Sequence, residues 1–474
     1  MFLVQKFKSL SALVVVVLVI ILFCTQLNLS PWANAGKGKS LIRNDVVSYY
    51  GYLPATFIYK DLSLNFIDTA STDYRSKHQF WPKTAPNGNK VFKFTMGMSI
   101  MYSPFFLIAH TYSKISRHYS DNGFSKPYEI ALALSCLFYL IFGLFFLRKT
   151  LLLFFSEFIA SIVLVVLVVG TNLLYYSTSE PCMSHAYSFS LISIFIFLSI
   201  KWHQKQTIKK ALVIGLVSGL IVLIRPVNLV ILLFPFFLGV NSLATFRQNC
   251  RLFLKNWKQL LAMAIVAFLI VFPQLLYWKL TTDNWVYHSY VDEHFFFLNP
   301  HLSEFLMSYR KGWLVYTPIM VFALVGIAIS FKSNKRLFLP ILMISLLNTY
   351  ILSCWWCWWY GGSFGMRSMI DMYAFYGLAL GVFLQWMIAQ KSVLKGSLSI
   401  VLILLVCLNI FQTAQRRHLV IHWDSMTKQS YWRYFLTYKF DNQQDWIEQE
   451  KLLKHPDYQK ALIGEDEYEF KVFD

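Results

Sequence analysis

The chain is dominated by a series of apolar runs, each close to the length that crosses a lipid bilayer as a helix. About 20 apolar residues span the hydrocarbon core. The first run covers residues 10–23, and later runs occupy residues 128–147, 157–178, 186–200, 211–224, 227–246, 259–278, 312–331, 337–353, 370–390 and 397–413. Charged residues make up only 14% of the 474 positions, whereas soluble proteins carry about 25%. These runs predict an all-α polytopic membrane protein with about 11 transmembrane helices, in a range of about 9 to 13.

Lysine and arginine indicate how the helices are oriented, because short cytoplasmic loops are enriched in these residues. Lys6 and Lys8 precede the first run, which predicts an uncleaved signal anchor with its N-terminus inside. Residues 97–112 form a short segment that contains Pro104, so we expect an interfacial helix there rather than a crossing. With that choice the inner loops hold Arg148, Lys149, Lys201, Lys205, Lys209, Lys210, Arg247, Arg251, Lys255, Lys258, Lys332, Lys335, Arg336, Lys391 and Lys395.

The chain divides into a membrane body and a polar tail. Residues 1–413 are expected to form the body, including a long periplasmic loop at 28–127 with interfacial helices. Residues 414–474 predict a small periplasmic tail or cap. Arg225-Pro226 interrupts a long apolar run and predicts a tight hairpin, because proline ends or kinks a helix. The formal charge of +19 fits loops that face anionic headgroups. We therefore expect a multi-pass protein of the bacterial inner membrane, with membrane lipids and no nucleic acid as partners.

Polar residues gather at the predicted outer ends of the helices. Asp45 follows the first span, and Arg225 lies at the top of the hairpin. Glu180 and His185 belong to one short outer turn, and Arg367 follows a glycine-rich stretch that opens a later helix. Ionisable residues close to membrane depth are costly, so they are candidates for function. The sequence predicts one outer site with two carboxylates, a histidine and two guanidinium groups.

Each of these residues also has a purely structural interpretation. Asp45 suits a helix cap, and Glu180 with His185 suits a solvated loop pair. Arg225 suits an arginine that extends its charged end to the headgroups. The glycines before Arg367 also suit a plain helix start. No cofactor is required by the sequence, although Asp45, Glu180 and His185 are a possible ligand set for a divalent metal.

In their order and common side, these residues resemble the GT-C-type membrane glycosyltransferases. That family uses polyprenyl-phosphate-linked sugars and includes protein mannosyltransferases and aminoarabinose transferases. The resemblance covers roughly residues 10–390. It rests on Asp45 with Tyr49 and Tyr50, on Lys93 with Gly97 and Pro104, on Glu180-Pro181, on Arg225-Pro226 and on Gly362-Ser363-Phe364-Gly365-x-Arg367. The sequence departs from the family in having a single acid at position 45 and Thr95-Met96 where Tyr-Pro is common.

The resemblance implies an inverting hexosyl- or pentosyltransferase with its active site on the periplasmic face. Asp45 would be the general base that activates the acceptor hydroxyl, with Glu180 as a second catalytic carboxylate. Arginine suits the donor phosphate because its planar fork binds two oxygens. The expected phosphate-binding residues are Arg225, Arg367, Lys93 and Lys83, and the expected substrate-binding residues are Tyr49, Tyr50, His185 and Ser363. The acceptor would be a glycan, a lipid or a protein.

Two other functions fit parts of the pattern. An O-antigen polymerase or ligase shares the lipid phosphate and the outer arginines but takes an oligosaccharide donor. A lipid or solute transporter would place its polar residues at mid-membrane beside broken helices. Cys354 and Cys357 form a C-x-x-C pair that suits either redox chemistry or packing at the membrane interface.

Overall fold

The computed structural model describes residues 9–34, 40–69 and 80–465. Helix is the dominant secondary structure of this part of the chain, and strands are almost absent. Its sheet is a two-stranded antiparallel hairpin of β1 (Lys83–Thr84) and β2 (Lys90–Val91). Seven of the described helices are long and apolar enough to cross a membrane. The prediction of an all-α multi-pass membrane protein is therefore confirmed.

Shorter elements separate the long apolar helices as far as α18 (Lys335–Ser353), after which the last long helices follow one another directly. The long ones are α1 (Leu10–Leu29), α7 (Lys126–Leu151), α10 (Ser184–Gln204), α14 (Trp257–Thr282), α18 (Lys335–Ser353), η4 with α19 (Arg367–Met372 and Tyr373–Ile388) and α20 (Ser392–Arg417). The first shorter elements are η2 (Pro31–Asn34), α2 (Asp45–Tyr50), α3 (Tyr52–Phe57), α4 (Phe66–Thr69), α6 (Gly97–Ser116), α8 (Glu157–Val169), α9 (Leu173–Thr178), α11 (Ile208–Ile224), η3 (Pro226–Leu233) and α12 (Phe234–Phe237). The others are α13 (Leu243–Lys255), α15 (Leu302–Met307), α16 (Trp313–Tyr316), α17 (Met320–Ser333), α21 (Lys428–Arg433), α22 (Gln443–Glu450) and α23 (Tyr458–Leu462).

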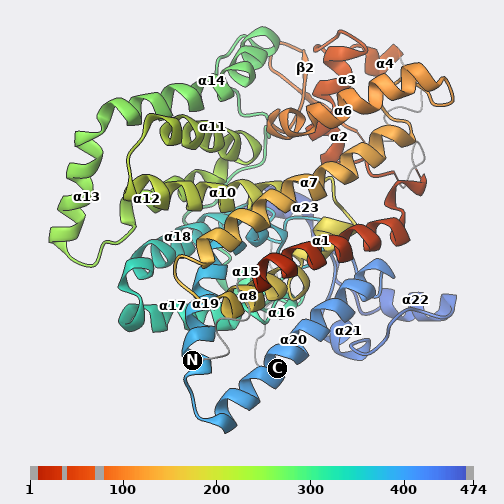
Figure 1. The fold of residues 1–474 in the computed structure, drawn as a ribbon. Helices are drawn as coiled ribbons and strands as arrows, with labels where there is room; N and C mark the ends of the chain where they lie inside the picture. Colours follow the sequence, from red (N-terminus) through yellow and green to blue (C-terminus); the bar gives the residue numbers. More distant parts are fainter. Residues whose placement is uncertain (1–8, 35–39, 70–79, 466–474) are drawn as a thin grey trace.

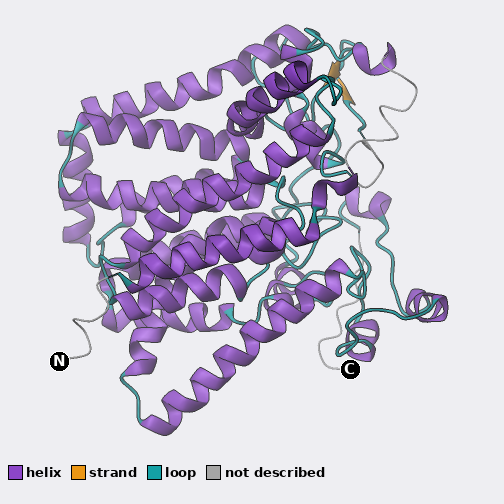
Figure 2. Ribbon diagram, turned by 45° about the vertical axis from the view of Figure 1, so that its right-hand side comes forward, coloured by secondary structure: helices purple, strands orange, loops and turns teal. Residues whose placement is uncertain are grey.

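The long helices run side by side, and most of the longer loops gather at one end of the bundle (Figure 2). That end, here called the loop end, carries α2 to α4, the β hairpin and the C-terminal helices α21 and α22 (Figure 1). At the opposite end, here called the α13 end, α13 lies across the ends of the long helices (Figure 1).

Helices α11 and α14 approach closely because α11 presents two glycines four residues apart. A Cβ at Gly215 would lie 2.5 Å from the carbonyl oxygen of Met263, and one at Gly219 would lie 2.9 Å from that of Ala267. Without a hydrophobic driving force between helices in lipid, small residues that allow close backbone packing are a main source of helix association. This pair of glycines therefore determines how α11 packs on α14. It thereby also determines the position of Arg225, which follows α11 at the loop end.

We expect Gly215→Leu to destabilise the protein by about 1–3 kcal/mol, the usual cost of inserting side-chain atoms into a packed interior. The measurement is the thermal unfolding midpoint in detergent. Gly396→Leu is the matched control, because a Cβ at Gly396 meets nothing within 4 Å. Equal midpoints for the two variants would contradict the close packing of α11 on α14.

The segment after Arg225 differs from the single helix expected at 227–246. It forms the 3-10 helix η3, the single α-helical turn α12, and then a loop before α13. Pro235 lies inside this stretch and lacks the amide hydrogen that a continuous α-helix requires. A 3-10 helix rises about 2 Å per residue. The segment η3 is therefore longer than an α-helix with the same number of residues. At its far end Phe236 stacks on Phe253 of α13, with ring centroids 4.3 Å apart.

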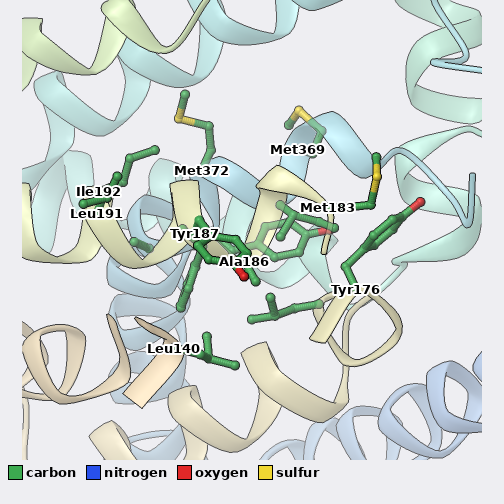
Figure 3. Packing of buried hydrophobic residues seen from close by; sticks show 14 of the residues in the cluster. Leu140, Tyr176, Met183, Ala186, Tyr187, Leu191, Ile192, Met369 and Met372 are labelled. Carbon is green, nitrogen blue, oxygen red and sulfur yellow. The ribbon is translucent and has the colours of Figure 1, made fainter. Parts of the chain in front are cut away.

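The core beneath the loop end is built mainly from α10. Its side chains pack against α7 and the 3-10 helix η4, which brings Leu140, Ala186, Tyr187, Leu191, Ile192, Met369 and Met372 together (Figure 3). The hydroxyl groups of Tyr187 and Ser135 lie 2.5 Å apart, which satisfies both inside the apolar core. This packing holds the first turn of α10 and η4 side by side, and both contribute side chains to a buried polar cluster.

Candidate active site

Arg225 is positioned by the proline that follows it. The residue before a proline favours extended backbone, and Arg225 has φ −149° and ψ 104°. The α-helix α11 therefore ends at Ile224, and the arginine joins a buried cluster. Its Nη1 lies 3.4 Å from Oδ2 of Asp371 and 2.9 Å from Nδ1 of His185.

Asp371 is the centre of this cluster, and it was not among the residues predicted from the sequence. The side chain is fully buried in η4. Oδ1 lies 3.0 Å from Nδ1 of His185, and Oδ2 accepts a hydrogen bond of 2.9 Å from Nδ2 of Asn228. A buried carboxylate is tolerated only when charge and hydrogen bonds compensate for lost water. Arg225, His185 and Asn228 supply that compensation, and these four residues form the Asp371 cluster.

Asp45 and Arg367 form a second ion pair at the loop end, although 322 positions separate them in the chain. Nη2 of Arg367 lies 3.1 Å from Oδ2 of Asp45. The Asp45 side chain keeps 32% of its surface exposed, while Arg367 keeps 15%. Asn44 is the N-cap residue of α2, and Asp45 is the first residue of the helix. The Asp45 carboxylate therefore faces an arginine and stays accessible, instead of serving as the N-cap.

Tyr49 lies close enough to both ion pairs for their charges to act on it. It is one turn after Asp45 on α2, is buried, and packs on Phe94 with ring centroids 4.5 Å apart. Burial, followed by the charge of Asp45, raises the pKa of Tyr49 to about 12, while the charges of Arg225 and Arg367 act in the opposite direction. Tyr49 is thus a neutral hydroxyl within electrostatic reach of Asp45 and both arginines.

Glu180 lies beside the same site but faces different partners. Its Oε1 accepts a hydrogen bond of 3.2 Å from the hydroxyl of Tyr175, and its charge also acts on Arg367. The guanidinium of Arg416 lies 5.7 Å from the centre of the Tyr175 ring. Arg417 donates to Ser179 and Thr178 at 2.8 and 2.7 Å. The end of α20 therefore adds two arginines to the Glu180 turn, and neither was predicted from the sequence as part of the site.

Lys93 and Lys83 converge on Glu293 in the loop between α14 and α15. The Lys93 ammonium is 2.6 Å from Oε1 of Glu293, and the Lys83 ammonium is 3.8 Å from the same oxygen. Trp356 donates to the other carboxylate oxygen at 3.0 Å. Lys93 also lies 5.2 Å from the ring centre of Tyr290. Glu293 therefore offsets only one of the two positive charges, and the proposed contact of both lysines with a phosphate stays a prediction.

Two expected substrate-binding residues are buried with partners of their own. The Tyr50 hydroxyl donates to the carbonyl of Gly123 at 2.5 Å. The hydroxyl of Ser363 donates to Gly365, and its backbone carbonyl accepts 2.7 Å from the ammonium of Lys311. Lys311 is itself fully buried, and burial lowers its pKa well below the usual range, with Arg416 adding to the effect. Tyr50 and Ser363 therefore hold the site's framework rather than line its surface.

The C-terminal tail holds the glycine-rich loop that carries Arg367. The carbonyl of Trp423 accepts from the amide of Ser363 at 2.9 Å, and the carbonyl of His422 accepts from Lys311 at 3.3 Å. Nδ1 of His422 accepts from the amide of Ser425 at 3.1 Å. This acceptor role requires an unprotonated nitrogen. The tail thus contributes to the position of Arg367 through backbone contacts.

Acid is expected to loosen this tail contact. Burial lowers the pKa of His422 to about 4, below the ordinary value of about 6.5. The stability that neutral His422 contributes is therefore complete above about pH 6.5 and is lost as the pH falls toward 4. In His422→Gln, the drop in thermal midpoint between about pH 7 and about pH 4.5 should be smaller than in wild type. Identical pH profiles would contradict the role of His422 as an acceptor.

The structure also places the residues of the metal and redox alternatives. Among the described residues no group of three or more His, Cys, Asp or Glu side chains forms a metal site. Asp45, Glu180 and His185 each face a different partner, namely Arg367, Tyr175 and Asp371. Cys354 and Cys357 are both buried free thiols. Buried thiols of this kind suit packing rather than exchange chemistry.

Known proteins give no further guidance to this site. The chain matches no model of a known protein family, and no curated protein matches it. The arrangement itself offers a carboxylate beside an arginine, a second arginine held by a buried carboxylate, and a neutral tyrosine hydroxyl within electrostatic reach of both arginines. Such a set combines a proton acceptor with two cations, which suits transfer from an anionic leaving group.

Proposed function

We propose that the chain is a GT-C-type membrane glycosyltransferase, which moves a sugar from a polyprenyl-phosphate-linked donor to a glycan, lipid or protein acceptor. The supporting observation is the pairing of Asp45 with Arg367 next to Arg225 at one end of an apolar helix bundle. A polyprenyl donor keeps its chain in the bilayer and its phosphate at the surface. The donor phosphate therefore lies at the same depth as the arginines at the helix ends.

In the proposed reaction Asp45 accepts the proton of the acceptor hydroxyl as its oxygen attacks the anomeric carbon. The new carbon–oxygen bond forms on the face opposite the phosphate, so the anomeric configuration inverts. The bond between the anomeric carbon and the phosphate oxygen breaks, and its electron pair leaves with polyprenyl phosphate. Arg225 and Arg367 hold that phosphate, because a guanidinium binds two oxygens at once. Arg367 exchanges the Asp45 carboxylate for the phosphate, which frees Asp45 to act as base.

Glu180 and Tyr49 have supporting parts in this proposal. Glu180 orders the turn before α10 by accepting a hydrogen bond from Tyr175. Its negative charge attracts Arg367 and helps to keep it beside the donor phosphate. The neutral Tyr49 hydroxyl donates a hydrogen bond to the phosphate or to the sugar. The Asp371 cluster holds Arg225 in place so that its charge is available without rearrangement. The reaction as written needs no metal.

The proposal also fixes an orientation in a bacterial inner membrane. The basic loops lie at the α13 end, and short loops rich in lysine and arginine stay cytoplasmic. The loop end with the site is then periplasmic. The seven long helices, the three shorter apolar helices α8, η3 with α12, and α17, and α11 give the eleven proposed crossings. The helix α6 is outside this set and lies in the interface, with Gly97 against the backbone of Leu223 and Ile224.

The test is a transfer assay with purified protein in nanodiscs. Polyprenyl-phosphate donors carrying single hexoses or pentoses are incubated with membrane glycan, lipid and protein acceptors. Release of polyprenyl phosphate and a product of inverted anomeric configuration would support the proposal. Uptake of the donor into liposomes without a covalent product would replace it with a transporter. Activity confined to oligosaccharide donors would replace it with a polymerase or ligase.

A further inference from the structure

A second site lies at the α13 end, far from Asp45 and Arg367. Helix α10 connects the two ends, since it begins at Ser184 next to the Asp371 cluster and ends at Gln204. With 21 residues at about 1.5 Å each it is roughly 30 Å long. The site at the α13 end is therefore separate from the proposed transferase site and does not depend on transferase activity.

Helix α13 has three distinct faces. An exposed apolar face contains Leu243, Phe246, Cys250 and Leu254 and continues to Trp257 at the start of α14, with Leu243 75% and Leu254 72% exposed. A basic face beside it contains Arg247, Arg251 and Lys255, and Lys258 follows in the first turn of α14. An amphipathic helix with an apolar face and a cationic face lies in the plane of a membrane interface. Its position across the helix ends agrees with that orientation (Figure 1).

The third face of α13 is fixed to the bundle. Phe253 is buried between the rings of Phe236 and Trp202, with centroids 4.3 and 5.5 Å away. Nδ2 of Asn249 donates to the carbonyls of Phe236 and Leu238 at 3.1 and 2.9 Å. These contacts hold the helix in place through the protein itself.

Between this face and the bundle lies a cavity of about 480 Å³. Its polar lining comes from His203, Gln204, Thr245, Gln248, Asn249 and Arg336. No acidic residue contributes to the lining among the described residues. The volume falls within the roughly 300–1,000 Å³ of typical ligand sites, so a phosphate headgroup has room there.

Arg336 supplies the fixed charge of this cavity. Its guanidinium lies 5.8 Å from the ring centre of Phe154, and the structure shows no ion pair for it within the described part of the chain. Its backbone carbonyl accepts 3.1 Å from the amide of Gly239, which ties it to the cavity wall. Among the described residues, neither an ion-pair partner nor an acidic residue of the cavity lining offsets the charge of Arg336. Its guanidinium is therefore complementary to an anion.

We propose that the cavity between α13 and Arg336 binds the phosphate headgroup of an anionic phospholipid. The acyl chains run along the exposed apolar face of α13 into the bilayer, and the basic face contacts neighbouring headgroups. The apolar face favours a lipid over free phosphate, because a free ion would leave Leu243 and Leu254 uncovered. The proposed orientation, with the α13 end on the cytoplasmic side, places this lipid in the cytoplasmic leaflet, whose surface is anionic.

The test measures lipid binding to the full chain by native mass spectrometry in a zwitterionic detergent. The probes are phosphatidylglycerol, phosphatidylcholine with the same acyl chains, and inorganic phosphate. Arg336→Gln should weaken phosphatidylglycerol binding about fivefold, as expected for one basic group at a lipid surface. Gln248→Glu adds a negative charge to the same cavity without touching the arginine, and should weaken binding similarly. Lys391→Gln removes an exposed charge on another loop and should leave binding unchanged.

Each result decides the proposal. Tighter binding of phosphatidylglycerol than phosphatidylcholine, weakened about fivefold in both cavity variants and unchanged in Lys391→Gln, supports it. Equal binding of the two lipids overturns it, as does displacement of phosphatidylglycerol by an equal concentration of inorganic phosphate. Should Arg336→Gln fail to fold, Gln248→Glu decides alone, and unaltered binding in that variant overturns the proposal.

Discussion

Replacing Asp45 with Asn is expected to slow sugar transfer by about 10²–10⁴-fold, the range that a general base contributes. Asparagine keeps the size of the side chain but cannot accept the acceptor's proton. It also removes the carboxylate that lies 3.1 Å from Arg367. Donor affinity should be unchanged or higher, because the donor phosphate then meets one negative charge fewer. Single-turnover rates with a radiolabelled donor in nanodiscs measure the chemical step apart from donor binding.

Asp68→Asn is the matched control for this experiment. It makes the same chemical change in the same loop, but Asp68 is exposed and pairs with Lys90. Its transfer rate should stay within about twofold of wild type, as is usual for a surface pair of small energy. An Asp45→Asn variant with the wild-type rate would eliminate Asp45 as the base. Equal losses in both variants would indicate a general effect on the loop.

Asp371→Asn is expected to have the largest effect on stability. Removing one partner of a buried ion pair costs about 3–5 kcal/mol, because the other charge is left uncompensated. Here Arg225 would lose the carboxylate at 3.4 Å, and His185 would lose its partner at 3.0 Å. The measurement is the thermal unfolding midpoint in detergent, together with the donor affinity that depends on Arg225.

A second substitution separates charge from packing in this cluster. Arg225→Met combined with Asp371→Asn removes both charges, so the double variant should be more stable than Asp371→Asn alone. Residues in direct contact typically show such coupling, at about 0.5–3 kcal/mol. Glu448→Gln, in the exposed pair with Arg433, should not change the midpoint. Additive effects of the two cluster substitutions would contradict the pairing of Asp371 with Arg225.

Much of the fold follows from the apolar runs, because length and hydropathy determine which segments become membrane helices. Most of the predicted runs overlap the observed helices α1, α7, α10, α14, α18 and α20 closely. The stretch at 227–246 does not, since Pro235 and a 3-10 helix replace the expected continuous helix. Hydropathy does not distinguish these helix types, because both satisfy their backbone groups within the segment.

The candidate site was only partly predictable. The prediction that the polar residues lie at the same ends of the helices correctly places Asp45 and Arg367 together at one end of the bundle. It does not determine which side chains contact each other. The pairing of Lys93 with Glu293 is of that kind, because it depends on how two outer loops fold together. Asp371 was missed because it lies inside the apolar run at 370–390, which was interpreted only as a span. A lone carboxylate in such a run is itself a signal, since an intramembrane charge requires a partner.

The most direct test of the proposed mechanism is a structure of the protein in nanodiscs with polyprenyl monophosphate bound. We expect the phosphate at the loop end, within hydrogen-bonding distance of Arg225 and Arg367, with the Asp45 carboxylate released from Arg367. Arg367→Ala should remove the bound phosphate in the same preparation. A phosphate bound elsewhere, with Asp45 still paired to Arg367, would contradict the proposed site and the mechanism built on it.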